Sequence, residues 1–147
     1  MHLPAVSSPD NIKKYKTLSG ISVYVYKADI CSLNVDCIVN AANSRLDHAG
    51  GVAGVIQRKA GYDLKTEGDR YIRKHGEIKV GSVVETLAGN LPFKFVLHAV
   101  GPRWGDYTHS STGVDECCKD LREAVFNSFL KASTLGMQSI ALPAISS

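Results

Sequence analysis

The chain has 147 residues and a mass of 15.8 kDa, which is enough for one domain with a single hydrophobic core. Hydrophobic residues make up 44% of it and charged residues 21%, which excludes wholesale disorder, and no apolar run reaches the roughly 18 residues that cross a bilayer. The net charge of +3 is too small to indicate a nucleic-acid footprint, so nucleic acid stays a possible partner without support, and we expect no membrane partner.

The first part of the chain predicts a tail, two strands and a glycine loop. Residues 1–16 carry two prolines and a lysine-rich patch, and they predict an N-terminal tail. Residues 21–26 alternate apolar and polar side chains, as a half-buried strand does. Residues 35–39 are more apolar and predict an interior strand. A glycine-rich loop at 48–51 follows this second strand.

Helices and strands then alternate to the end of the chain. We expect helices over about 52–60 and 64–74, strands over 83–86 and 93–100, a long helix over about 114–135, and a short strand over 139–142. The apolar stripe of the long helix consists of Leu121, Val125, Phe129 and Ala132. This order predicts a three-layer α/β domain. Ligands of such folds lie outside the carboxyl ends of the strands, so the segments after Val39, Val100 and Leu142 are the candidate sites.

The cysteines and histidines do not indicate a metal site. Cys31, Cys37, Cys117 and Cys118 form no C-x-x-C pair, and the five histidines form no H-x-x-x-H pattern. We therefore expect no metal and no cofactor. Unpaired thiols are typical of cytoplasmic and nuclear proteins, so we expect one of these locations.

The segment after the second strand has the residue types of a nucleotide site. Asn40 and Asn43 offer donors and acceptors that suit ribose hydroxyls. The glycine pair Gly50-Gly51 opens a helix, whose free amides and dipole suit a phosphate. The loop lacks the G-K-[ST] ending of a Walker A motif. Taken alone, a glycine pair that only serves a turn remains an alternative explanation.

Five segments together resemble the macro domain family over about residues 18–147. They are D-I at 29–30, V-N-A-A-N at 39–43, G-G-V-A-G at 50–54, H-A-V-G-P at 98–102 and L-P-A-I-S-S at 142–147. The glycine loop and the H-A-V-G-P-R-W segment look most like those of the tandem macro domains of large vertebrate ADP-ribosyltransferases. The resemblance implies a mixed-sheet α/β/α sandwich that binds ADP-ribose, free or attached to protein. It makes mono-ADP-ribosylated proteins the expected partners.

The resemblance also implies roles for individual residues. Asp29 would accept the adenine amine, the Ile30 amide would support the base, and Asn43 would face the distal ribose as the candidate catalytic residue. Amides of Gly50, Gly51 and Val52 would bind the diphosphate, and Ser146 and Ser147 would begin a second phosphate loop. The other expected ligand contacts are Ala41, Ala49, Ala53 and Ala144. Asn40 and His98 are expected to be structural, and His48 is a candidate polar wall beside the distal ribose. Arg103 and Trp104 look like rim residues, and packing in a satellite core is an equal alternative for Trp104.

Two departures from the family pattern bear on function. Family members that hydrolyse mono-ADP-ribosyl esters by the best-understood route carry an aspartate where this chain has Ala53. The loop therefore lacks an obvious general base. This favours a reader of mono-ADP-ribosylated proteins, and a hydrolase that holds its water without a loop aspartate is the alternative. The family pattern also continues past Ser147. We therefore expect residues 17–147 to be a macro domain without its C-terminal part, within a longer multidomain protein.

Overall fold

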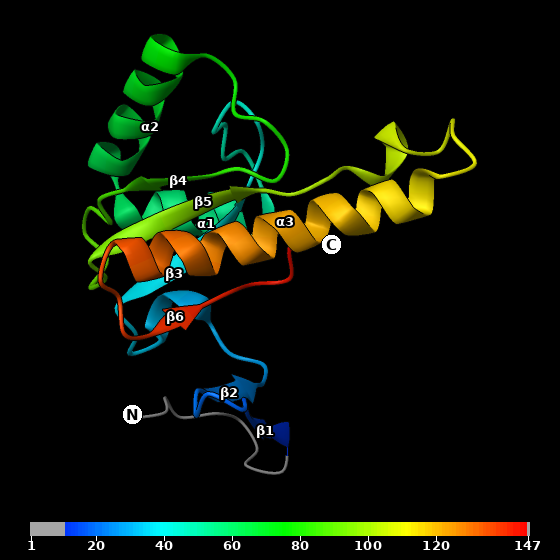
Figure 1. Ribbon diagram of the computed structural model, residues 1–147. Coiled ribbons are helices and arrows are strands. Elements are labelled where there is room, and N and C mark those ends of the chain that lie inside the picture. The colour runs from blue at the N-terminus through cyan, green and yellow to red at the C-terminus, as the bar shows by residue number, and fades with distance from the viewer. Residues whose placement is uncertain (1–10, 147) are drawn as a thin grey trace. The chain divides into compact units, whose positions relative to one another are not determined.

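The computed structural model describes residues 11–146 (Figure 1), and these form two compact units, the first ending at Asn34 and the second beginning at Val35. In the first unit, β1 (Lys13–Lys16) pairs antiparallel with β2 (Ser22–Val25). A 3-10 helix, η2 (Ile30–Ser32), follows them. The strand predicted at 21–26 is thus present in a shorter form.

The tail predicted for residues 1–16 is too long, because residues 13–16 form β1. Their lysine-rich sequence does not prevent this pairing, because backbone groups make the ladder and the turn closes it locally. Thr17 Oγ1 accepts a hydrogen bond from Ile21 N at 3.0 Å, and Gly20 takes a φ of 89° that suits glycine. Residues 1–10 of the predicted tail lie outside the described residues.

The second unit contains a four-stranded mixed sheet with the order β4-β5-β3-β6. The strands are β3 (Cys37–Ala42), β4 (Val83–Thr86), β5 (Phe95–Val100) and β6 (Ile140–Ala141). β3 runs parallel to β5 and β6, whereas β4 runs antiparallel to β5. The carboxyl ends of β3, β5 and β6 therefore meet at one edge of the sheet.

Strand β3 begins and ends later than the predicted range of 35–39. Its pairing with β5 continues through Asn40, Ala41 and Ala42, residue types that rarely favour strands on their own. The ladder with β5 outweighs this weak preference. As a result, Asn40 lies inside the sheet and not in the loop after it.

The two faces of the sheet bury different side chains, as the period of two in a strand requires. Cys37, Val39, Leu97 and Ala99 form one core with Ala132 of α3 (Gly113–Thr134). On the other face, Val84 and Val100 pack with Leu46 and Ile78, and with Tyr71 of α2 (Tyr62–His75). Helix α1 (Gly51–Ala60) precedes α2 and contacts β3. The predicted three-layer α/β/α sandwich with a central mixed sheet is confirmed (Figure 1).

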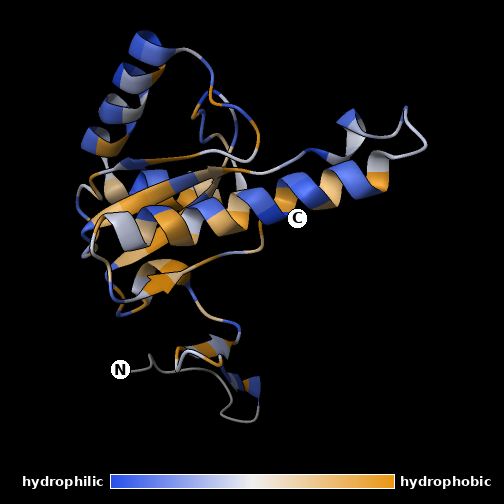
Figure 2. Cartoon of the chain, in the orientation of Figure 1, coloured by the Kyte–Doolittle hydropathy of each residue, from blue (hydrophilic) through white to orange (hydrophobic). Residues whose placement is uncertain are grey.

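Most predicted boundaries in this unit are confirmed to within a few residues. Figure 2 shows that the strands of the sheet consist largely of apolar residues and that α2 consists largely of hydrophilic ones. A second 3-10 helix, η3 (Trp104–Asp106), has no counterpart in the predicted elements. Among the described residues, no helix is long and apolar enough to cross a membrane, and no three His, Cys, Asp or Glu side chains gather as a metal site.

The predicted apolar stripe of α3 is wrong at Phe129, which is half exposed. Apart from Gly113 at the start of the helix, the buried positions are Ala124, Ser128 and Ala132, which follow one another at helical spacing of four residues. These small side chains let α3 lie close to the strands, and the larger ones, including Phe126 and Leu130, face outward. Size at the contact therefore decides which face of α3 is buried.

Candidate functional site

A cavity of about 260 Å³ lies at the carboxyl ends of the parallel strands. Three segments from different parts of the sequence form it: the end of β3 with the glycine loop, the loop after β5, and the segment after β6. Its lining residues are Ala41, Ala42, Gly50, Gly51, Val52, Ala53, Gly101, Pro102, Arg103, Ala144, Ile145 and Ser146. Seven of the residues predicted to contact a ligand are in this set. They belong to the first and third of these segments, and none of them belongs to the loop after β5.

The glycine loop presents the start of α1 to this cavity. Gly50 is the residue before the helix, and no side chain caps the helix there. The first amides of α1 have no partners within the helix, and they carry its positive dipole end. A Cβ atom built at Gly50 or Gly51 would meet nothing within 4 Å, so the space in front of these amides is open. Gly51 also has a φ of 58°, which glycine adopts without strain. The arrangement suits an anion.

Gly101 brings the other two segments together. A Cβ atom at this position would overlap Ser146 Oγ and Ile145 Cγ2, so the loop after β5 passes directly against the segment after β6. Ser146 itself has a positive φ of 63°, uncommon for a residue with a side chain. The close contact between these two segments of the cavity therefore depends on Gly101, which belongs to the H-A-V-G-P motif.

Arg103 is the one charged residue among the lining residues. It agrees with the predicted rim position, and the neighbouring Trp104 is 56% exposed. The glycine loop has Ala53 in place of an aspartate, and none of the other described lining residues carries a carboxylate either. The cavity can therefore bind negative charge but holds no obvious general base.

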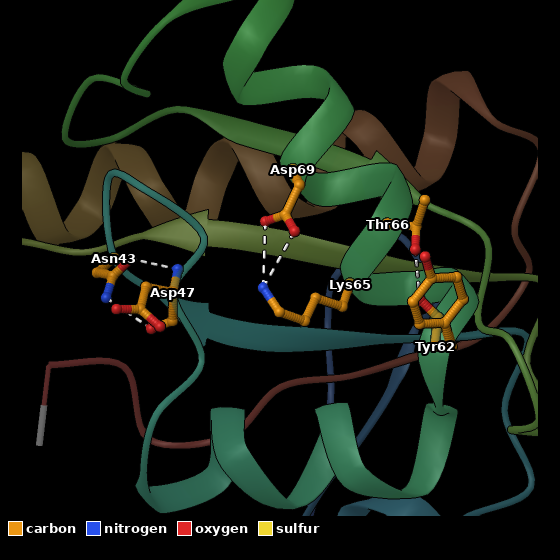
Figure 3. A network of polar contacts seen from close by, with 6 residues as sticks. All are labelled: Asn43, Asp47, Tyr62, Lys65, Thr66 and Asp69. Atoms are coloured by element: carbon orange, nitrogen blue, oxygen red, sulfur yellow. Dashed lines mark hydrogen bonds and ion pairs between the residues drawn. The ribbon is translucent and has the colours of Figure 1, made fainter.

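Asn43 braces the turn that leads into the glycine loop (Figure 3). Its Nδ2 donates to the Asp47 carbonyl oxygen at 2.8 Å, and its Oδ1 accepts from the amides of Asp47 at 2.9 Å and Arg45 at 3.2 Å. Within this turn Leu46 takes a φ of 53° and inserts its side chain into the core, where it is 2% exposed. Asn43 does not line the cavity, and its predicted contact with the distal ribose stays a prediction.

Asp29 and Ile30 belong to the first unit of the chain. Asp29 precedes η2, and its Oδ1 accepts a hydrogen bond from Cys31 N at 2.9 Å. This N-cap gives the carboxylate a local structural role. The predicted contacts of Asp29 and Ile30 with adenine stay predictions.

Two predicted ligand contacts remain, Ala49 and Ser147. Ala49 is exposed and does not line the cavity. Ser147 lies outside the described residues. Sequence reasoning missed Ala42, Gly101, Pro102 and Ile145 as lining residues, although each lies inside a motif that it had singled out. The available signal was their position at the carboxyl ends of the parallel strands: Ala42 ends β3, Gly101 and Pro102 follow β5, and Ile145 lies in the segment after β6.

A buried polar cluster lies within the sheet and beneath the glycine loop. The amide Nδ2 of Asn40 is 3.3 Å from His48 Nδ1 and 3.1 Å from His98 Nδ1, and His98 Nε2 is 2.9 Å from Thr86 Oγ1. The two imidazole rings stack with centroids 5.1 Å apart. Asn40 and His98 are fully buried, in agreement with their expected structural roles. The polar-wall prediction for His48 is wrong, because the residue is 4% exposed and belongs to this cluster.

Burial makes both histidines of the cluster difficult to protonate. Burial, with the neighbouring His48 adding to it, lowers the pKa of His98 from 6.5 to about 3. Burial also lowers the pKa of His48. Asp47 and Asp69 oppose that change, and Lys65 adds to it. Both rings are therefore neutral near pH 7.

Comparison with known proteins identifies relatives of this chain. The family model of the Macro domain matches residues 39–147. An uncharacterised protein of Saccharolobus solfataricus is 48% identical over 132 residues, which are 90% of this chain and 70% of that protein. The O-acetyl-ADP-ribose deacetylase of Escherichia fergusonii is 44% identical over 84% of this chain and 67% of its own length. Human protein mono-ADP-ribosyltransferase PARP14 is 38% identical over 87% of this chain but 7% of its own length.

Solved structures share the fold. The Oceanobacillus iheyensis macrodomain with ADP superposes with a TM-score of 0.81 at 28% identity, over 92% of this chain and 69% of that chain. The Trypanosoma brucei macrodomain in complex with ADP-ribose has a TM-score of 0.66 at 31% identity, over 82% and 46% of the two chains. Across four of the curated relatives, this chain spans 63% to 70% of their length.

Proposed function

This chain belongs to the macro domain family, and from that premise we propose that it binds ADP-ribose and acts as a reader module for mono-ADP-ribosylated proteins. The observation that carries the proposal is the set of uncapped amides at the start of α1, which open onto the cavity at the strand ends. A diphosphate is a dianion of suitable size for such a site.

The diphosphate would lie between two backbone segments. The amides of Gly51, Val52 and Ala53 would bind it from one side, and the segment of Ala144 to Ser146 would bind it from the other. Arg103 at the rim adds positive charge. The complexes named for two structural relatives, one with ADP and one with ADP-ribose, support the choice of ligand.

The chemistry of the cavity favours a reader over a hydrolase. Hydrolysis of the bond between ribose and protein needs an activated water, and a positioned base normally supplies that activation. Ala53 stands in the glycine loop, and the other described lining residues are not acidic. A module with this lining would hold the modified protein without removing the modification. We also propose a cytoplasmic or nuclear location for such a reader.

A calorimetric titration with ADP-ribose tests the proposal through a matched pair of variants. Gly50 and Gly105 both have open space where a side chain would begin and neither has a strained φ, but only Gly50 lines the cavity. We expect Gly50→Glu to abolish binding, because it adds bulk and negative charge in front of the amides, and Gly105→Glu to bind like the wild type. Normal binding by Gly50→Glu would refute the proposed diphosphate site.

The second candidate function is hydrolysis of mono-ADP-ribosyl bonds. Its support is the 44% identity to a protein named O-acetyl-ADP-ribose deacetylase. Incubation with a mono-ADP-ribosylated protein and with O-acetyl-ADP-ribose, followed by measurement of released ADP-ribose, decides between the candidates. We expect no release by the wild type and a measurable rate for Ala53→Asp, because general-base catalysis contributes about 10²–10⁴-fold. Rapid release by the wild type would establish the hydrolase.

A further inference from the structure

His48 anchors the glycine loop from inside the protein. Its neighbours Asp47, Ala49, Gly50 and Gly51 are all exposed, whereas its own side chain is 4% exposed. Its carbonyl oxygen lies against the first turn of α1, 3.5 Å from where a Cβ of Gly54 would be. The position of this one side chain therefore bears directly on the amides that face the cavity.

The contacts of Asn40 determine which nitrogen of each imidazole carries the proton. An amide NH2 group has two donors, and Asn40 Nδ2 faces the Nδ1 atoms of His48 and His98. Both Nδ1 atoms must therefore be unprotonated acceptors. His98 then has its proton on Nε2, from which it donates to Thr86 Oγ1 at 2.9 Å.

The reverse orientation of the Asn40 amide satisfies fewer groups. As placed, the cluster leaves one buried atom without a partner, Asn40 Oδ1. The reverse orientation would leave both amide donors without a partner in the same buried position, which is the costlier arrangement. The observed orientation therefore requires two neutral imidazoles.

We propose that Asn40 and His48 are positioning residues for the ligand, because the Asn40 amide holds the His48 ring, and with it the glycine loop, only while that ring is neutral. A proton on His48 Nδ1 would place a donor against the Asn40 donor at 3.3 Å and would put a charge beside the His98 ring. The loop would then lose its internal anchor, and the α1 amides would lose their fixed position.

The groups around His48 set the pH range of this effect. Asp47 lies on the same loop, while Lys65 and Asp69 come from α2, where they pair with each other at 3.0 Å (Figure 3). His98 lies on β5 and is neutral. Burial outweighs the two carboxylates and lowers the pKa of His48, so affinity should fall below about pH 6.5 and not above it. The diphosphate of ADP-ribose stays ionised throughout this range.

The inference rests on the proposed ADP-ribose binding, and the experiment separates the two. Long-range ¹H–¹⁵N spectra of the free protein near pH 7.5 report the protonated nitrogen of each imidazole without any ligand. We expect both His48 and His98 to carry their proton on Nε2. A proton on Nδ1 of His48 would overturn the inference, whether or not ADP-ribose binds.

Affinity for ADP-ribose is then measured by calorimetry between about pH 7.5 and 4.5, with circular dichroism at each pH to confirm that the protein is folded. We expect the wild type to lose affinity on acidification, because protonation of His48 competes with the binding conformation. His48→Asn places a non-titrating amide oxygen near the position of Nδ1, so it should bind near pH 7.5 within a few-fold of the wild type and lose the pH dependence. The matched control His109→Asn changes an exposed histidine and should keep it.

His48→Leu keeps the bulk but removes the acceptor, so we expect weaker binding, by about tenfold, at every pH. A wild-type affinity that does not change between these pH values would overturn the inference. So would a pH dependence that His48→Asn retains. If the folded wild type does not bind ADP-ribose near pH 7.5, the proposed function fails, and the tautomer spectra still decide the state of the cluster.

Discussion

Acid should destabilise this protein through His98 before its carboxylates titrate. His98 is fully buried between β3 and β4, with Asn40 and Thr86 on its two nitrogens. In the folded chain its pKa is about 3, whereas in the unfolded chain it returns to about 6.5. Below pH 6.5 the unfolded state therefore binds a proton that the folded state does not. The free energy of unfolding must fall as the pH falls through this window.

The size of the effect follows from the width of the window. Each pH unit between 6.5 and 3 costs about 1.4 kcal/mol for one such group. From pH 6.5 to pH 5, His98 alone lowers the free energy of unfolding by about 2 kcal/mol, and His48 adds to this in the same direction. A domain of this size has about 5–15 kcal/mol in total, so the loss is large.

Urea denaturation followed by circular dichroism at several pH values between about 7.5 and 5 measures this loss. The range stops at about 5 because carboxylates with ordinary pKa values near 4 begin to contribute below it. An NMR titration of the folded protein provides the residue assignment, since the His98 ring should show no protonation in this range. A free energy of unfolding that is constant from pH 7.5 to 5, or a His98 resonance that titrates near 6.5, would refute the reasoning.

Three variants test other parts of the account. Gly101→Val inserts a side chain where Ser146 Oγ already lies, so it should abolish ADP-ribose binding and lower the free energy of unfolding by about 1–3 kcal/mol; normal affinity by calorimetry would show that this cavity is not the site. Asn43→Ala removes the brace of the loop and should cost about 1–3 kcal/mol in urea denaturation, and an unchanged midpoint would contradict its structural role. Asp29→Ala should weaken ADP-ribose binding about tenfold to a hundredfold if its carboxylate accepts the adenine amine, and an unchanged dissociation constant would exclude that contact.

Local sequence patterns predicted the framework of the second unit. Helix α1 begins at the second residue of the glycine pair, because Gly51 takes a φ of 58° that glycine adopts without strain. Strand β4 has the predicted bounds of 83–86, since its β-branched residues favour a strand, and it pairs antiparallel with β5. Most of the lining residues that the glycine loop contributes to the cavity were predicted as well, because this loop is continuous in sequence.

Other features depend on contacts between distant residues, which no local pattern contains. The long β3 depends on its ladder with β5, and the outward position of Phe129 depends on how closely α3 approaches the sheet. The wall made by Gly101 exists only because the loop after β5 meets Ser146.

Asn40 and Asn43 show most clearly what the sequence determines and what the tertiary structure decides. By itself, the sequence determined that Asn40 and Asn43 stand between the start of a buried strand and a glycine loop, because residue type and spacing are local properties. Only the tertiary structure decided that Asn40 lies inside the sheet between two neutral histidines, while Asn43 braces the exposed turn with its own side chain. Their surroundings differ because β5 and His48 bury the first residue, and the chain has already left the sheet at the second.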